Sequence, residues 1–170
     1  MDFASETKSG KVGSITIRRA VWEEIVDLRH LVLRGGLPKE EAIFPGDEFP
    51  TSRHYAAFIP QTSGHRTVGC ATLHLSKWEG EAAYQLRGMA TAPEARRMGL
   101  GRALLRLAEQ EILADASLPR LLWCNARVPA LAFYREMGWT VVSEQFEIPT
   151  AGPHVRMVRR LEPPSAEVKT

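Results

Sequence analysis

The sequence has few of the residues that mark a cross-linked, metal-binding or membrane protein. Its 170 residues include only two cysteines, Cys70 and Cys124, and no Cys-x-x-Cys pair, which argues against a zinc knuckle or a thioredoxin-type motif. The histidines lack metal-ligand spacing, so we expect no metal. No window approaches the roughly 18 apolar residues of a membrane span, and the polar N-terminus does not resemble a signal peptide. We therefore expect a cytoplasmic protein that does not bind membranes.

The chain also has no strong excess of charge. Its 22 Lys and Arg residues nearly balance 20 Asp and Glu residues, and a net charge of +2 is too small to indicate nucleic acid. A composition of 44% hydrophobic and 25% charged residues is typical of a globular protein. The length fits one domain with its own core. We expect a flexible leader over 1–13, a single domain over 14–161 and a polar tail over 162–170.

The order of predicted elements indicates an α/β domain with a mixed sheet. Apolar–polar alternation and short apolar runs predict strands over 14–19, 54–59, 67–75, 81–91, 121–124, 139–146 and 155–161. Helical periodicity and end signals predict helices over 20–33, 38–42, 100–116 and 129–137. Turn residues predict loops over 44–52 and 148–153.

A basic, glycine-containing turn joins the strand over 81–91 to the helix that begins near residue 100. Residues 96–101 follow the pattern R-x-x-G-x-G, in which Gly99 and Gly101 let a ligand approach the main chain. The unpaired N–H groups and positive dipole end of the following helix would favour an anion such as a pyrophosphate. Three arginines add positive charge: Arg96, Arg97 and Arg102.

Other phosphate-binding loops fit this turn poorly. The chain has no G-x-x-x-x-G-K-[ST], which excludes a P-loop nucleotide hydrolase. The turn is not a G-x-G-x-x-G after a first strand, which argues against a dinucleotide-binding fold. Taken alone, the turn is equally compatible with glycines that serve only the backbone.

Three segments at consistent separations resemble the GNAT superfamily of N-acetyltransferases. Residues 96–101 match the signature [Q/R]-x-x-G-x-[G/A], and residues 123–126 (WCNA) and 132–139 (AFYREMGW) resemble the family's fifth strand and the end of its last helix. Residues 144–157 are similar to ElaA-like bacterial members. The resemblance implies an α/β (α+β), GNAT-like fold, with a central mixed, mostly antiparallel twisted sheet of about seven strands and helices on both faces.

The resemblance also implies an activity: an acetyl group passes from acetyl-CoA to a primary amine by direct attack in a ternary complex. Met89, Ala90 and Thr91 would bind the pantetheine as an added strand, and the Ala90 N–H would stabilise the oxyanion. Asn125 would bond the pantetheine, and Tyr134 would protonate the leaving thiolate. The implied cofactor-binding set is Met89, Ala90, Thr91, Arg96, Arg97, Met98, Gly99, Leu100, Gly101, Arg102, Asn125 and Tyr134.

The general base is not identified by this resemblance. Many members carry a glutamate where this chain has Gln85, whose amide cannot accept a proton at useful pH. His74 and His154 are candidate bases, each with a structural alternative, or the amine arrives neutral. Tyr134 likewise has an alternative reading, as an amphipathic tyrosine at a helix edge with its hydroxyl in water.

The partner expected from the resemblance is an amine-bearing acceptor, either a small molecule or a peptide. Variable loops over 33–52 and 148–153 would build its site, and Asp47 and Glu48 in the first loop could attract a cationic amine. A homodimer and acyl groups other than acetyl stay open. One alternative is a non-catalytic acyl-CoA-binding or sensing module. The other, a nucleic-acid-binding domain, would use four arginines: Arg96, Arg97, Arg102 and Arg106.

Overall fold

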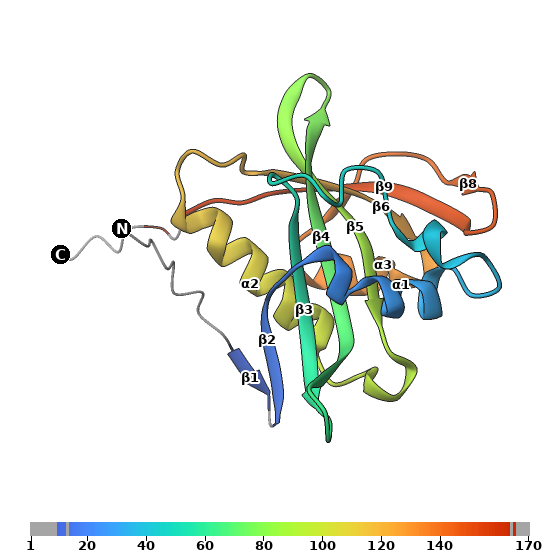
Figure 1. Cartoon of the computed structure of the whole chain (residues 1–170). Helices are drawn as coiled ribbons and strands as arrows, with labels where there is room; N and C mark the ends of the chain where they lie inside the picture. Colours follow the sequence, from blue (N-terminus) through green and yellow to red (C-terminus); the bar gives the residue numbers. More distant parts are fainter. Residues whose placement is uncertain (1–9, 13, 164, 166–170) are drawn as a thin grey trace.

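The computed structural model describes residues 10–12, 14–163 and 165 (Figure 1). Most of the expected leader and tail, 1–9, 13, 164 and 166–170, lies outside the described residues. Gly10–Val12 form a strand that pairs with the next one, so the sheet begins before residue 14, the expected start of the domain.

The described residues form strands, α-helices and short 3₁₀ turns. The strands are β1 Gly10–Val12, β2 Ile15–Ala20, β3 Arg53–Pro60, β4 His65–Trp78, β5 Glu81–Thr91, β6 Leu121–Arg127, β7 Thr140–Val141, β8 Phe146–Ile148 and β9 Gly152–Arg160. The helices are α1 Val26–Leu33, α2 Leu100–Ala114 and α3 Leu131–Glu136, with 3₁₀ turns at Trp22–Glu24, Lys39–Ala42, Pro93–Ala95 and Val128–Ala130. The strands make one sheet in the order β1-β2-β3-β4-β5-β6-β9-β7, with β8 beside β9.

One parallel pair interrupts an otherwise antiparallel sheet, as predicted. β5 and β6 pair only at Tyr84 with Leu122 and at Gln85 with Trp123. β5 then continues to Thr91 and β6 to Arg127 without pairing to each other. The two strands therefore diverge, and each leaves an unpaired backbone edge facing the gap.

A bulge in β5 lies beside this divergence. Cys70 of β4 pairs with Ala90, whereas Thr72 pairs with Arg87, so three steps along β5 match two along β4. Gly88 inside the bulge has φ +59°, a conformation that favours glycine. A Cβ there would lie 2.6 Å from Nε of Arg29, so the position also lacks space for a side chain.

Helices cover both faces of the sheet, which confirms the predicted layers (Figure 1). On β4, Thr72 accepts a hydrogen bond from Arg29 of α1, and Gly69 packs against Leu100 and Leu104 of α2. Because neighbouring strand residues face opposite sides, positions 69 and 72 place α1 and α2 on opposite faces. The apolar side of α2 is buried, and it includes Leu104, Leu105, Ala108 and Ile112.

The strand predicted over 139–146 forms only in part: β7 covers Thr140–Val141, and β8 begins at Phe146. β7 stops at Val141, and the N–H of Arg156 on β9 bonds the side-chain Oγ of Ser143 instead of a backbone carbonyl. This side-chain acceptor ends the ladder, because it takes the place of a strand partner. The chain resumes as β8, which forms a tight hairpin with β9, so much of the loop expected over 148–153 is strand.

Candidate functional site

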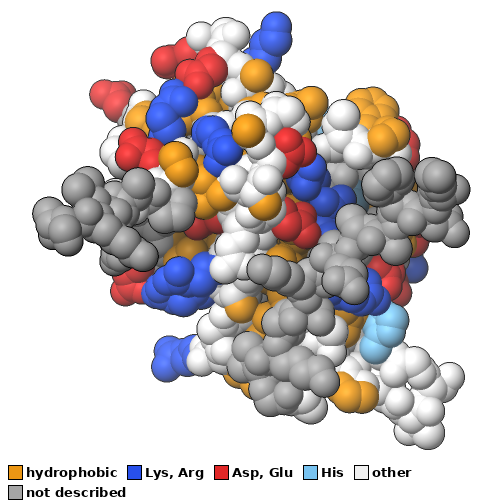
Figure 2. All heavy atoms as spheres, turned by 90° about the vertical axis from the view of Figure 1, so that its left-hand side faces the viewer, with side chains coloured by type: hydrophobic (Ala, Val, Ile, Leu, Met, Phe, Trp, Pro, Cys, Tyr) orange, Lys and Arg blue, Asp and Glu red, His pale blue; other side chains and the backbone are white. Residues whose placement is uncertain are grey.

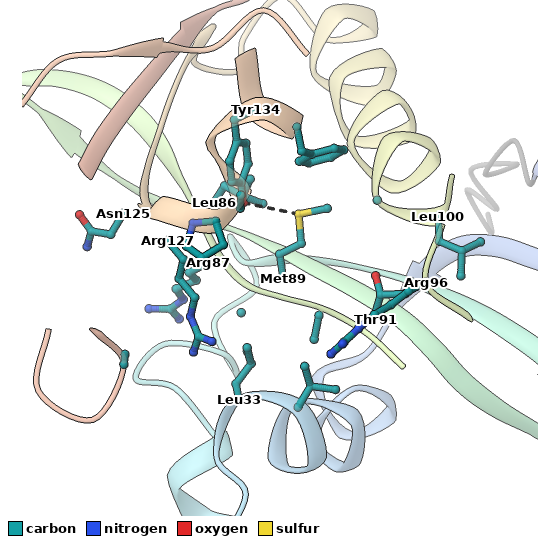
Figure 3. Close-up of a pocket in the computed structure, with 18 of the residues that line it drawn as sticks. Leu33, Leu86, Arg87, Met89, Thr91, Arg96, Leu100, Asn125, Arg127 and Tyr134 are labelled. Atoms are coloured by element: carbon teal, nitrogen blue, oxygen red, sulfur yellow. Dashed lines mark hydrogen bonds between the residues drawn. The ribbon is translucent and has the colours of Figure 1, made fainter. Parts of the chain in front are cut away.

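A pocket of about 1090 Å³ opens where β5 and β6 diverge (Figure 3). Its walls are β5 over 85–91, the turn and first residues of α2 over 95–102, the end of β6, and α3. Leu33 and Phe44 line it from one expected acceptor loop, and Ile148 from the other. Both loops named from the sequence therefore reach the site.

The start of α2 presents a row of free backbone donors to this pocket. Arg97 has φ +65° and Gly99 has φ +75°, so the turn curls its N–H groups into a concave nest. The Ala103 N–H donates to Gly99, but none of the six preceding N–H groups, 97–102, has an acceptor within the described chain. Six unpaired donors at a helix start form an anion site.

The two glycines of this turn serve different purposes. A Cβ on Gly99 would meet no atom within 4 Å, so this glycine is needed for its positive φ and leaves open space above the turn. A Cβ on Gly101 would lie 3.0 Å from Cε of Met89 and 3.3 Å from the Phe133 ring. We expected both glycines to let a ligand approach, but Gly101 also lets β5 and α3 pack closely against α2.

The arginines of the turn surround the free donors. Arg96, Arg97 and Arg102 all line the pocket, and Arg102 forms an exposed ion pair with Glu136 at 3.4 Å. The Met98 side chain is exposed and does not line the pocket, so only its backbone can contribute.

Around α2, acidic side chains pair with the arginines that a nucleic-acid-binding surface would need to leave free. Arg19 and Arg53 pair with Glu111 of α2 at 3.3 and 3.5 Å, and Arg159 pairs with Glu109 at 3.0 Å. On the face seen in Figure 2, Lys and Arg side chains are interspersed with Asp and Glu.

The structure does not support Ala90 as the oxyanion donor. The Ala92 N–H donates to Val68 of β4 at 2.8 Å, and N–H directions alternate along a strand, so the Ala90 N–H also points toward β4. There Ala90 is the strand partner of Cys70, whose thiol donates to the Gly88 carbonyl at 3.4 Å. The Thr91 N–H, between Ala90 and Ala92, faces the gap, and Met89 lies in the bulge, where this alternation is interrupted.

Tyr134 is buried rather than placed at a wet helix edge. It is 8% exposed, whereas the neighbouring Phe133 is only half-buried. Its hydroxyl lies 3.7 Å from Sδ of Met89, inside the pocket (Figure 3). Burial, together with the nearby Cys124, raises the pKa of Tyr134, so the hydroxyl keeps its proton at working pH. The ring packs edge-on against Phe133 and Trp139.

Asn125 supplies an unpaired polar atom on the other side of the gap. It lies on β6 and lines the pocket. Its Oδ1 is buried and has no hydrogen-bond partner in the described part of the chain. A buried amide oxygen without a donor is costly, so this position suits a ligand that brings an N–H.

The two candidate histidines are in different places. His74 does not line the pocket; its Nδ1 lies 3.2 Å from Ser52 Oγ, and its ring packs beside Gly46 and Phe49. His74 therefore holds the 44–52 loop, and its candidacy as a base is withdrawn. Burial, then the charge of Arg87, lowers its pKa.

His154 does line the pocket and is almost fully buried. Its Nδ1 lies 2.8 Å from the carbonyl oxygen of Gly152. Because a carbonyl oxygen only accepts, Nδ1 carries a proton, which leaves Nε2 as the nitrogen that can accept one. The ring stacks on Phe146, which fixes its orientation.

A buried polar cluster anchors the first acceptor loop, and the sequence patterns did not reveal it. Arg29 and Asp47 form an ion pair whose side chains have no exposure, and Arg29 also donates to Thr72 at 2.6 Å. His54 Nε2–H donates to the Asp47 carbonyl, so its Nδ1 accepts from the Thr72 hydroxyl. Arg87 adds a second guanidinium to Asp47 at 3.3 Å. The expectation that Asp47 attracts a cationic amine is therefore wrong.

Two further findings limit the chemistry of the described residues. No group of three or more His, Cys, Asp or Glu side chains that could hold a metal ion occurs among them. None of the helices they form is long and apolar enough to cross a membrane. Cys70 and Cys124 are both buried free thiols, and burial raises the pKa of each to about 12.

Comparison with known proteins identifies the fold and the family. Residues 22–139 match the Acetyltransferase (GNAT) family. The chain is 31% identical over 140 residues to the uncharacterized N-acetyltransferase YitI of Bacillus subtilis, covering 82% of this chain and 91% of that protein.

Two solved structures share the fold. Escherichia coli ElaA is 16% identical, with a TM-score of 0.66 over 85% of this chain and 99% of that one. An aminoglycoside 6'-N-acetyltransferase in complex with coenzyme A is 13% identical, with a TM-score of 0.62 over 84% of this chain and 91% of that one. The family match and the similarity to YitI together establish that the chain is an N-acetyltransferase that belongs to the GNAT family, whose members use acetyl-CoA.

Proposed function

We propose that the chain transfers the acetyl group of acetyl-CoA directly to a primary amine in a ternary complex at the pocket between β5 and β6. The observation that carries this proposal is the continuity of three features along one cavity. They are the free N–H groups over 97–102, the unpaired edge of β5, and the Tyr134 hydroxyl beside Met89.

The donor set fits coenzyme A. The N–H groups over 97–102, with Arg96 and Arg97, would hold the pyrophosphate. The β5 edge at Met89 and Thr91 would pair with the pantetheine amides as an added strand. The unpaired Oδ1 of Asn125 would accept a pantetheine N–H. When bound, acetyl-CoA supplies an activated acyl group as a thioester.

Three groups of the chain would assist the transfer. The amine nitrogen attacks the carbonyl carbon, a C–N bond forms, and the C–S bond breaks. In place of Ala90, we assign the Met89 N–H to the charge that develops on the carbonyl oxygen, because Met89 lies in the bulge of β5, lines the pocket and contacts the Tyr134 hydroxyl. Tyr134 would donate its proton to the departing sulfur, because its hydroxyl lies beside Met89.

The proton lost by the amine needs an acceptor, and the pocket offers His154. Its Nε2 lone pair is available in the neutral ring, and it lies on the wall formed by the second acceptor loop. Gln85 also lines the pocket and could orient a water molecule but not take the proton. His154→Gln should therefore lower the rate most at a pH where the amine is charged.

The experiment that tests the proposal measures turnover of acetyl-CoA with a panel of amines, and the free CoA thiol that is released is the readout. The panel should include amino acids, amino acid amides, a peptide N-terminus, spermidine and kanamycin. Thiol release that depends on an amine, with the acetylated amine found by mass spectrometry, supports direct transfer. Acetylation of the enzyme itself, chased to the amine in a second step, would contradict the ternary complex.

A further inference from the structure

The acceptor side of the pocket is positively charged throughout. Away from the turn before α2, its charged side chains are Arg34, Arg87 and Arg127. No Asp or Glu occurs among the described residues that line the pocket. Figure 3 places Arg87 and Arg127 on the side of Met89 opposite Arg96, so this group is separate from the arginines of the turn.

The acids nearest to this group do not neutralise it. Asp47 has no exposure, and its carboxylate already accepts from Arg29, Arg87 and the Phe44 N–H. One carboxylate thus balances only one of two guanidinium groups. Glu48 is exposed and does not line the pocket.

The arginines keep donors free for a ligand. Arg87 is held by bonds from Nη2 to the Pro45 carbonyl and to Asp47, while its Nη1 makes no hydrogen bond within the described chain. Arg34 donates only to the carbonyl of Leu33, and Arg127 occurs in none of the ion pairs of the described residues. Guanidinium groups match the planar shape of a carboxylate and bind it through paired hydrogen bonds.

An apolar surface accompanies these charges. The Phe44 ring lies 5.1 Å from the guanidinium carbon of Arg34 and 5.9 Å from that of Arg87. Leu33 and Ile148 line the same pocket. A ligand that places a negative group on the arginines would therefore have apolar contacts available for a side chain.

We propose that the acceptor is a small amino carboxylic acid with an apolar side chain, whose carboxylate binds Arg87 and Arg127. This inference rests on the proposed acetyl transfer and names its substrate class. Polyamines and aminoglycosides are disfavoured, because their extra ammonium groups would meet arginines without a carboxylate to pair with.

The same charges bear on the missing glutamate at position 85. A positive environment disfavours the ammonium form of a bound amine and so lowers its pKa. The acceptor would then lose its proton more readily, which reduces what His154 must contribute. The arginines would thus select the acceptor and also prepare its nitrogen for attack.

The test compares kcat/KM for three amines with one side chain: L-phenylalanine, L-phenylalaninamide and 2-phenylethylamine. The carboxylate preference is the ratio of L-phenylalanine to each of the others. Arg127→Gln should reduce this preference about tenfold to a hundredfold, the value of a charged hydrogen bond. Arg106→Gln, on the exposed side of α2 and outside the pocket, is the matched control and should leave the preference unchanged.

A second measurement does not depend on chemistry. Calorimetry of N-acetyl-L-phenylalanine added to the CoA-saturated enzyme should show binding that weakens in Arg127→Gln and persists in Arg106→Gln. In the kcat/KM comparison, each amine is compared between variants, so differences in pKa among the amines cancel.

The outcomes separate the two proposals. Transfer to spermidine or 2-phenylethylamine that equals or exceeds transfer to L-phenylalanine overturns the substrate class and leaves acetyl transfer standing. An enzyme that binds CoA but neither turns over any amine nor binds any carboxylate probe also overturns the substrate class. A chain that neither binds CoA nor releases thiol with any amine removes the proposed function, and the inference with it.

Discussion

Replacing Tyr134 by Phe separates the catalytic role of its hydroxyl from the packing of its ring. The ring contacts Phe133 and Trp139 with centroids 5.2 and 5.5 Å away, and Phe keeps both contacts. The hydroxyl's partner in the described chain is the Met89 thioether at 3.7 Å, which is a weak acceptor. The free energy of unfolding should therefore fall by less than about 1 kcal/mol, and CoA affinity should hardly change.

The rate of acetyl transfer should respond more strongly. General acid catalysis is worth roughly 10²–10⁴-fold, but CoA thiolate leaves readily and water can replace the donor. We expect the low end, a loss of roughly tenfold to a hundredfold in kcat, or about 1.4–2.7 kcal/mol. Because the pKa of Tyr134 is raised, its ionisation should not appear in the neutral part of the pH–rate profile.

The assay is single-turnover transfer at saturating acceptor, with CoA release shown not to limit the rate. Tyr84→Phe is the matched control, since Tyr84 is a buried tyrosine of β5 that does not line the pocket. Its kcat should stay at the wild-type value. A Tyr134→Phe enzyme that transfers acetyl as fast as wild type under these conditions would refute the assignment and leave Tyr134 a packing residue.

Three further predictions concern the polar cluster and the β5 bulge. Gly88→Ala should lower stability by more than Gly80→Ala in urea unfolding, because both have positive φ but only Gly88 has Arg29 within 2.6 Å of the new Cβ. Asp47→Asn leaves Arg29 buried without its anion and should lower the free energy of unfolding by about 3–5 kcal/mol. A loss smaller than that for breaking an exposed ion pair would contradict the burial of this pair. Burial lowers the pKa of His54 below 6.5, so the native state resists its protonation and stability should fall as pH drops below 6.5. A flat stability between pH 7 and pH 5 would contradict that sign.

Much of the fold followed from local patterns, and the exceptions have physical causes. The spacing of apolar residues located α2, and the glycine turn located its start. Val21 lies within the helix predicted over 20–33 but is 57% exposed, because α1 begins only at Val26. The break after β7 depends on one side-chain oxygen, Ser143 Oγ, which periodicity does not reveal.

The site was predicted in part. The sequence placed the residues on the right strands but did not give the direction in which their N–H groups and side chains point. The sequence located β5 over 81–91, but which N–H faces the gap depends on pairing with β4, and that excluded Ala90. His74 lies on the predicted strand but faces the 44–52 loop. Arg87 and Arg127 were missed, because arginines on strands carry no motif and acquire meaning only when the fold brings them to one pocket.

The most direct test of the central claim is a crystal structure of the protein in complex with CoA. The pyrophosphate oxygens should lie within about 2.7–3.2 Å of N–H groups over 97–102, and the pantetheine should run between β5 and β6 with its amides on the main chain of Met89 and Thr91. A complex whose phosphates bind away from the start of α2, or whose pantetheine lies outside the gap, would contradict the account.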